Sequence, residues 1–156
     1  MGADRVEESY RRLHARLWRS LFAFCGDREL ASDAEAEAYA QALGRVDDLR
    51  DVDAWVWRSA FRIATGALAD RTTGARSASP EQLDVLPTED ASVVEFVSQL
   101  QALSGQQRAV VVLRYVGGLT PAEIAEALGT SSGSVRVQLH RAHHRLRNDL
   151  EVLDGR

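Results

Sequence analysis

The sequence predicts an all-α protein of two small helical domains joined by an acidic linker, the C-terminal domain being a helix-turn-helix. Three observations support this fold class. Apolar residues recur at helical spacing in both parts of the chain, and a stretch rich in proline, serine and acidic residues separates them. Capping residues and glycines mark helix ends, and arginines and histidines crowd the last helical segment. We place the first domain at 1–71, the linker at 72–90 and the second domain at 91–156.

The first domain is predicted to contain three helices. The first covers 7–24 and ends at Gly26, and its apolar face consists of Tyr10, Leu13, Leu17, Leu21 and Phe24. The second opens at the capping box Ser32-Asp33-Ala34-Glu35 and stops at Gly44. A polar loop over 44–53 leads into the third helix, which we expect from Asp53 to about Ala69. Helices with such short links form a small all-α bundle.

The segment 72–90 interrupts the helical pattern with Gly74, Pro80 and Pro87. Five acidic residues and no basic residue lie between positions 81 and 95. Charge runs of this kind are usually solvated tethers, and we expect one here. Helical periodicity then resumes near Val93 and continues to Tyr115.

The segment 104–148 has the pattern helix, break, helix, short turn, helix. Thr120 can cap a helix whose first residue is Pro121, and Glu123 completes a capping box. Gly129 ends this helix, and Ser132 or Ser134 begins the next, whose inward positions are Val135, Leu139, Ala142 and Leu146. The other faces of that helix carry only basic charges, at Arg136, His140, Arg141, His143, His144, Arg145 and Arg147. A helix-turn-helix places its second helix in the major groove of DNA, so the sequence predicts duplex binding.

The net charge of −4 is unevenly distributed along the chain. Residues 101–156 hold seven arginines and five acids, and residues 1–100 hold twelve arginines and eighteen acids. The two parts therefore carry about +2 and −6. A basic DNA-binding helix is compatible with this acidic total.

Several other classes of protein find no support in the composition. No apolar run approaches the roughly 20 residues of a membrane span, and no signal peptide is seen, so we expect a cytoplasmic protein without membrane insertion. Cys25 is the only cysteine and cannot form an internal disulfide. His140 and His144 stand four residues apart on a helix, but no carboxylate or cysteine lies nearby to complete a metal site. We expect no metal, no cofactor and no catalytic set, and hence no enzyme.

The motifs LSGQQR (103–108), LRY (113–115), GLT (118–120), EIAEALG (123–129) and SVRVQLHRAHHRLR (134–147) resemble region 4 of sigma-70 family factors, most closely the extracytoplasmic-function (ECF) type. In the first domain, ASDAEAEAY (31–39) resembles region 2.2 and AWVWRSAFR (54–62) resembles region 2.3. The order of region 2, acidic linker and region 4 is also that of an ECF sigma factor.

This resemblance implies a promoter-specificity factor that binds core RNA polymerase through the β′ clamp helices and the β flap, and binds promoter DNA. An anti-sigma factor is a further partner that it admits. Polymerase would contact Asp33, Glu37 and Tyr39, which we expect on one face of the second helix. The −10 single strand would contact Arg45, Arg50, Trp55, Arg58 and Arg62. The −35 duplex would contact Thr120, Ser132, Ser134, Arg136, Val137, Gln138, His140, Arg141 and Arg145.

The first domain departs from the family pattern at several positions. Phe61-Arg62 replaces the usual Arg-Asn, and Gly66 replaces an aspartate. The loop over 44–53 holds four aspartates and two arginines. Trp55 and Trp57 could stack on a base, but core packing is favoured for both. Two alternatives therefore stay open: a sigma-like regulatory protein that binds polymerase or a regulator without opening promoters, and a helix-turn-helix repressor with an N-terminal dimerisation domain.

Overall fold

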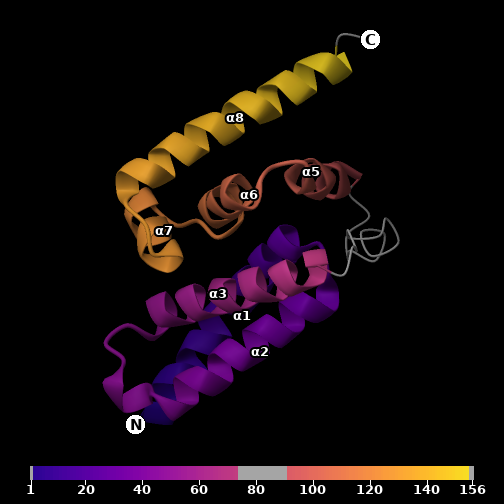
Figure 1. Cartoon of the computed structure of the whole chain (residues 1–156). Helices are drawn as coiled ribbons and strands as arrows, with labels where there is room; N and C mark the ends of the chain where they lie inside the picture. Colours follow the sequence, from indigo (N-terminus) through magenta and orange to yellow (C-terminus); the bar gives the residue numbers. More distant parts are fainter. Residues whose placement is uncertain (1, 74–90, 155–156) are drawn as a thin grey trace.

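A computed structural model describes residues 2–73 and 91–154, and all regular structure in these ranges is helical. The first half consists of α1 (Gly2–Cys25), α2 (Arg28–Gly44), the short 3₁₀ helix η1 (Val46–Asp48) and α3 (Val52–Thr73). The second half consists of α5 (Ala91–Gln101), α6 (Gly105–Val111), the π-helical segment η2 (Val112–Val116), α7 (Pro121–Leu128) and α8 (Ser132–Asp154) (Figure 1). Most of the predicted linker falls outside the described residues. No helix in the described ranges has the length and apolarity that a membrane crossing requires.

The first half is a three-helix bundle in which α1, α2 and α3 share one core (Figure 1). The predicted stripe of α1 forms the centre of this core, where Leu13, Leu17 and Leu21 are almost completely buried. A full burial of a leucine side chain contributes roughly 1.5–3 kcal/mol to folding. The facing side of α2 is made of small residues that let the helices approach closely: Ala31, Ala34, Ala38 and Ala42.

The start of α2 differs from the prediction. The helix begins at Arg28, and its cap is Asp27, whose carboxylate accepts hydrogen bonds from the backbone N–H groups of Glu29 and Leu30. The Ser32 capping box is therefore wrong. The Ser32 hydroxyl instead accepts a hydrogen bond from the indole N–H of Trp18 on α1, at 3.0 Å. Because the Asp27 carboxylate already accepts from the free N–H groups of the first turn, the helix begins before Ser32, and Ser32 lies within it.

Of the other helix ends in the first half, those at Gly26 and Gly44 agree with the prediction, and two helices extend further than predicted. Gly26 has φ +69°, a left-handed conformation that suits glycine, and α2 ends at Gly44 as predicted. Helix α1 begins at Gly2 instead of residue 7, and α3 continues to Thr73 instead of about Ala69. Polar first and last turns lack the apolar spacing by which periodicity detects a helix.

In the second half, the helix predicted across Val110–Tyr115 changes its winding. Residues Val112–Val116 form a π-helical turn, and the Gly117 N–H donates to the Val112 carbonyl at 2.9 Å. A Cβ at Gly117 would lie 2.8 Å from the Leu113 carbonyl oxygen and 3.1 Å from the Trp57 ring. Only a glycine fits this close approach between the π turn and the first half.

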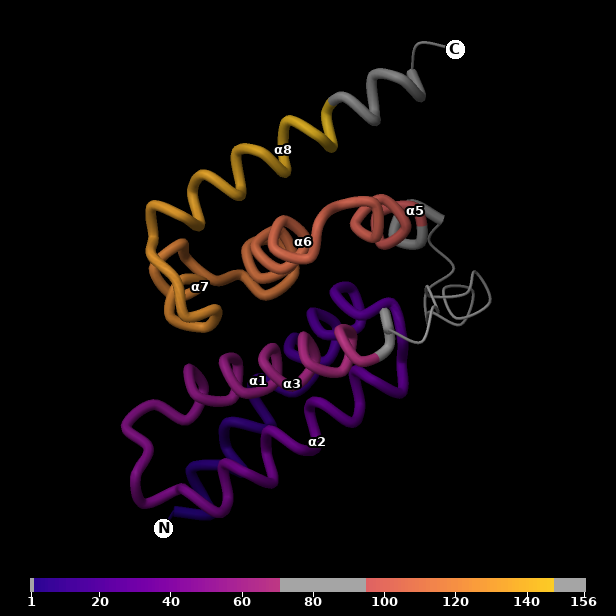
Figure 2. Tube along the Cα trace, in the orientation of Figure 1, coloured from indigo at the N-terminus to yellow at the C-terminus, as the bar shows by residue number. Residues whose placement is uncertain are grey.

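The two halves pack against each other along α1 and α3, which contact η2 and α7. The buried residues of both halves form one hydrophobic cluster. Gln101 of α5 donates from its amide nitrogen to the Ala23 carbonyl of α1 at 3.1 Å. Helix α8 packs on α6 and α7 and lies on the side of the second half away from the bundle (Figure 2).

Candidate nucleic-acid and polymerase surfaces

Helix α7 and the tight turn that joins it to α8 have the predicted capping geometry. The Thr120 hydroxyl accepts from the Glu123 N–H at 3.2 Å, and the Glu123 carboxylate accepts from the Thr120 N–H at 2.9 Å. These hydrogen bonds from Thr120 lower the pKa of Glu123. Gly129 closes α7 at φ +69°, and the Ser131 hydroxyl accepts from the Ser134 N–H at the start of α8. The predicted helix-turn-helix signals are thus confirmed, and Thr120 is occupied as a helix cap.

The predicted inner face of α8 is confirmed as well. Val135 and Ala142 are buried, and Leu139 and Leu146 are half-buried against the core. The opposite side is exposed and carries basic residues on three successive turns, with one apolar residue among them: Arg136, Val137, His140, Arg141 and Arg145. This exposed side of α8, together with Ser134, is called the α8 face below. It presents hydrogen-bond donors and positive charge without any acid.

Two predicted contact residues of α8 face the first half. The Gln138 amide donates to the Gln106 side chain of α6 at 3.3 Å. Ser134 and Gln138 also line a cavity of about 530 Å³, whose far wall includes Phe24 and Thr65 of the first half. In this packed arrangement, the beginning of α8 therefore faces the first half across this cavity.

Another contact on α8 could not be read from the sequence. The Tyr115 hydroxyl lies 2.6 Å from Nε2 of His143, and the two rings are 5.4 Å apart. Tyr115 is 57% exposed, so this pair forms an aromatic edge beside the α8 face. The π turn sets where Tyr115 points, and helical periodicity assumes an ordinary turn there.

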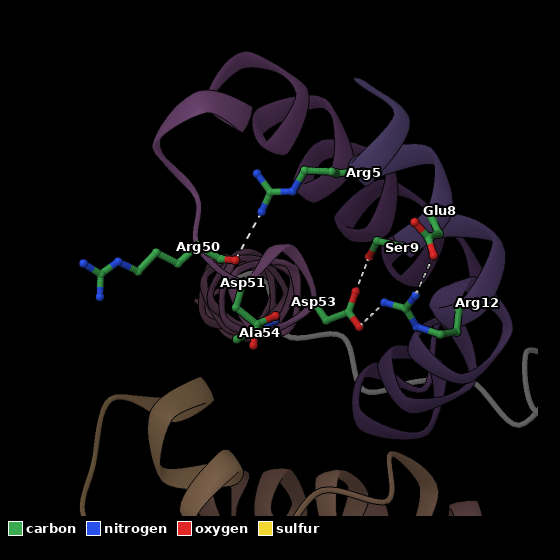
Figure 3. Close-up of polar contacts among 8 residues, drawn as sticks. All are labelled: Arg5, Glu8, Ser9, Arg12, Arg50, Asp51, Asp53 and Ala54. Carbon is green, nitrogen blue, oxygen red and sulfur yellow. Dashed lines mark hydrogen bonds and ion pairs between the residues drawn. The ribbon is translucent and has the colours of Figure 1, made fainter. Parts of the chain in front are cut away.

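The loop between α2 and α3 has less free negative charge than its composition indicated. Asp53 accepts hydrogen bonds from the Ser9 hydroxyl and the Arg12 guanidinium of α1, and Asp51 accepts from the Ala54 N–H (Figure 3). Of the two predicted strand contacts in the loop, Arg45 is exposed. The other, Arg50, is exposed too, and its side chain points away from the bundle (Figure 3).

The predicted strand contacts on α3 share one side of that helix. Arg58 and Arg62 are exposed and stand four residues apart, and Trp55, three residues before Arg58, is half-buried. The neighbouring Trp57 is only 4% exposed and packs in the core, with the Arg16 guanidinium 6.0 Å from its ring. A partly open tryptophan beside two cations is a suitable surface for a nucleic-acid base.

The predicted polymerase contacts on α2 divide between two faces. Asp33 and Glu37 are exposed, and Glu37 accepts from the Gln41 amide at 2.9 Å. Tyr39 is 7% exposed and packs edge-on against Tyr10, so the expectation that it shares the acidic face is wrong. Burial raises the pKa of Tyr39 to about 12. Tyr39 lies four residues after Glu35 and directly after Ala38, so it belongs to the buried side of α2, which the prediction did not recognise.

Comparisons with known proteins find relatives that cover most of the chain. The family model described as Sigma-70, region 4 matches residues 93–146. The RNA polymerase sigma-E factor of Streptomyces coelicolor is 34% identical over 156 residues, which cover 95% of this chain and 87% of that protein. The RNA polymerase sigma-E factor of Streptomyces avermitilis is also 34% identical, with 95% and 86% covered. The ECF RNA polymerase sigma factor SigD of Mycobacterium tuberculosis is 40% identical over 73 residues, 47% of this chain and 33% of that protein.

Solved structures show the same fold at lower identity. The sigma factor RpoE of Bartonella quintana, solved in complex with the anti-sigma factor NepR, gives a TM-score of 0.80 at 18% identity, with 94% of this chain and 96% of that chain covered. CnrH, solved in complex with the cytosolic domain of CnrY, gives 0.71 at 22% identity, with 97% and 95% covered. The chain belongs to the sigma-70 family of RNA polymerase sigma factors, in its extracytoplasmic-function group.

Proposed function

We propose that this chain binds core RNA polymerase and directs it to particular promoters. The observation that carries this proposal is the α8 face, a side of one helix with only basic charges, set behind a tightly capped turn. The major groove of B-DNA admits one α-helix, and a helix-turn-helix places its second helix there. From the resemblance to region 4 we infer that the duplex read by this helix is the −35 element of a promoter.

The side chains of the α8 face, and Gln138 beside it, suit different parts of that duplex. Arg136 or Arg141 could donate two hydrogen bonds to guanine, and Gln138 could pair with adenine through its donor and acceptor. His140 and Arg145, further along the helix, are suited to the phosphates. Val137, which is 47% exposed, offers an apolar contact for a thymine methyl group.

The first half would bind the unpaired strand of the −10 element. Arg45 and Arg50 of the loop, with Arg58 and Arg62 of α3, supply positive charge for a single-stranded backbone, and Trp55 supplies a stacking surface. Asp53 is paired with Arg12 of α1, so three acids of this loop, Asp47, Asp48 and Asp51, remain beside the four arginines. This balance favours a factor that opens promoters over the sigma-like regulator that does not.

Both contacts cannot be made at once in the packed arrangement. A −35 and a −10 element lie about 25 base pairs apart, roughly 85 Å along a duplex that rises 3.4 Å per pair. Ser134 and Gln138 instead line one cavity together with Phe24 and Thr65. We therefore propose that the halves separate when the chain binds polymerase, with 72–90 joining them. An anti-sigma factor would act by holding the chain in a form that cannot span both elements.

Polymerase binding would use the exposed acids of α2 for the β′ clamp helices and the second half for the β flap. The test is a double change, Asp33→Arg with Glu37→Arg, measured by binding to purified core polymerase. A matched control, Glu7→Arg with Asp70→Arg, changes the net charge equally at exposed positions on α1 and α3. We expect the α2 variant to lose binding and the control to keep it, with equal helicity by circular dichroism. Equal binding by both variants would remove α2 from the interface.

Polymerase binding, together with transcription by core polymerase, distinguishes the sigma factor from the two alternatives. A helix-turn-helix repressor would show no binding to isolated polymerase. A sigma-like regulator would bind polymerase without starting transcripts. Since core polymerase works in the cytoplasm, the proposed function places the chain there too.

A further inference from the structure

The first helix holds the loop between α2 and α3 from outside the loop's own sequence. The guanidinium of Arg5 donates to three loop carbonyls: those of Val46 at 3.3 Å, Leu49 at 2.8 Å and Arg50 at 3.2 Å. These acceptors lie 41 to 45 residues further along the chain. A planar guanidinium has several donors in a fixed arrangement, so one side chain can fix several carbonyls at once. Figure 3 shows Arg5 reaching from α1 to the backbone of Arg50.

Two further contacts between α1 and this region point the same way. A Cβ placed on Gly2 would lie 2.6 Å from Cγ1 of Val46, so the start of α1 is packed closely against the loop. At the other end of the loop, Asp53 accepts from Ser9 and Arg12 of the same helix (Figure 3). The loop is therefore fastened to α1 at its beginning, at its end and along its backbone.

This fastening determines which groups the loop presents. The carbonyls of Val46, Leu49 and Arg50 point toward Arg5, whereas the side chains of Arg45 and Arg50 are exposed and have no part in this fastening. We propose that Arg5 is a positioning residue that shapes this loop for base selection in the −10 strand. The proposal rests on the proposed function, because it takes this loop as the strand-binding one.

The physical reason is preorganisation. A loop that is already ordered loses less conformational entropy when a ligand binds, and its contact groups keep fixed positions. Fixed groups reject a wrong base because they cannot move to accommodate it, whereas a loose loop can adapt. Removing Arg5 should therefore reduce discrimination between bases more than it reduces initiation itself.

The experiment uses the full chain with core polymerase. A promoter obtained by mapping start sites is randomised over its −10 element, transcribed, and the transcribed templates are sequenced. The variants are Arg5→Ala, Arg5→Lys and Gly2→Ala, which crowds Val46. The control is Arg11→Ala, which removes an exposed arginine of α1 that pairs with Glu7 of the same helix. Thermal unfolding of each variant reports its folded fraction.

We expect Arg5→Ala to reduce the preference for the best base at one or more −10 positions by roughly tenfold, the factor expected from losing a charge-assisted hydrogen bond. Arg5→Lys keeps the positive charge but lacks the several fixed donors of a guanidinium, so it should retain part of the preference. Gly2→Ala should weaken the preference. Arg11→Ala should leave it unchanged. An unchanged base preference in Arg5→Ala would overturn the proposal, as would a uniform loss of output from all templates. If Arg5→Ala does not fold, a full parental preference in both Arg5→Lys and Gly2→Ala overturns it. A parent chain without any −10 preference would overturn the proposed function itself, and this inference with it.

Discussion

The guanidinium carbon of Arg108 lies 5.1 Å from the centre of the Phe24 ring, so a cation of the second half rests on an aromatic face of the first. Burial lowers the pKa of Arg108, because the charged form loses hydration at this seam. Its Nε is buried without a hydrogen-bond partner among the described residues. The Phe24 ring and the packing of the Arg108 methylene groups partly replace the hydration that the guanidinium loses.

Two substitutions of Arg108 should therefore separate packing from charge. Arg108→Ala removes the stem and the ring contact, and we expect it to lose about 1 kcal/mol in the free energy of unfolding. Arg108→Met keeps an apolar stem and discards the desolvated charge, so it should lie within about 0.5 kcal/mol of the parent or above it. Urea unfolding measures both. Equal losses in the two variants would show that the charge stabilises the seam more than the stem does.

Two glycines, one directly after the π turn and one inside α3, should respond oppositely to the same substitution. Gly117→Ala would force a Cβ against the Leu113 carbonyl oxygen, 2.8 Å away, and should cost roughly 1–3 kcal/mol. Gly66→Ala, on the exposed side of α3 with no atom within 4 Å of the new Cβ, should gain about 0.5–1 kcal/mol. Thermal unfolding of the two variants checks the sign. A stabilised Gly117→Ala would contradict the close approach between the π turn and Trp57.

The start of α2 can be tested by removing each of its two candidate caps. Asp27→Ala should cost about 1 kcal/mol or more, because the N–H groups of Glu29 and Leu30 lose their acceptor. Ser32→Ala removes an exposed hydrogen bond from Trp18 and should cost less. The comparison is made by chemical denaturation at neutral pH. A larger loss of stability in Ser32→Ala than in Asp27→Ala would indicate that α2 begins at the Ser32 cap after all.

Glu35 should make stability depend on pH. Its carboxylate is buried and lies 2.7 Å from Nδ1 of His14; burial raises its pKa above the ordinary value of 4.5, and His14 opposes the shift. A carboxyl with a raised folded pKa binds its proton more tightly when folded. Its contribution to stability is therefore present below pH 4.5 and is lost as the pH rises through the folded value.

It follows that Glu35→Gln, which cannot ionise, should gain stability relative to the parent as the pH rises from 4 to 7. Unfolding by denaturant at a series of pH values measures the difference between the two chains. Glu37→Gln, at an exposed position of the same helix, is the control and should follow the parent. A Glu35→Gln chain that loses stability relative to the parent as the pH rises would show that the pair with His14 outweighs burial.

Local signals in the sequence predicted several features that depend only on neighbouring residues. The Thr120 box, the left-handed Gly129 and the inward positions Val135 and Ala142 all follow from spacings of a few residues. The all-helical fold class follows from the same periodicity. The Ser32 box shows the limit, because Asp27 offered a competing cap five residues earlier.

Contacts between distant residues could not be predicted in this way. Arg5 meets the loop carbonyls across more than 40 residues, and nothing near Arg5 in the sequence marks it as a loop contact. Tyr39 was assigned to the acidic face, and its burial depends on the packing of α2 against α1. The packing of the two halves also depends on contacts such as Gln101 with Ala23, which join separate helices.

The measurement that tests the proposed function most directly is transcription by core polymerase on fragments of genomic DNA, with and without this chain, with the transcript ends sequenced. We predict start sites that appear only when the chain is present and that share two sequence blocks upstream. Gln138→Ala should alter the base preference within the farther block and leave the nearer block unchanged. Identical start sites with and without the chain, under conditions where the chain binds polymerase, would contradict its role as a promoter-specificity factor.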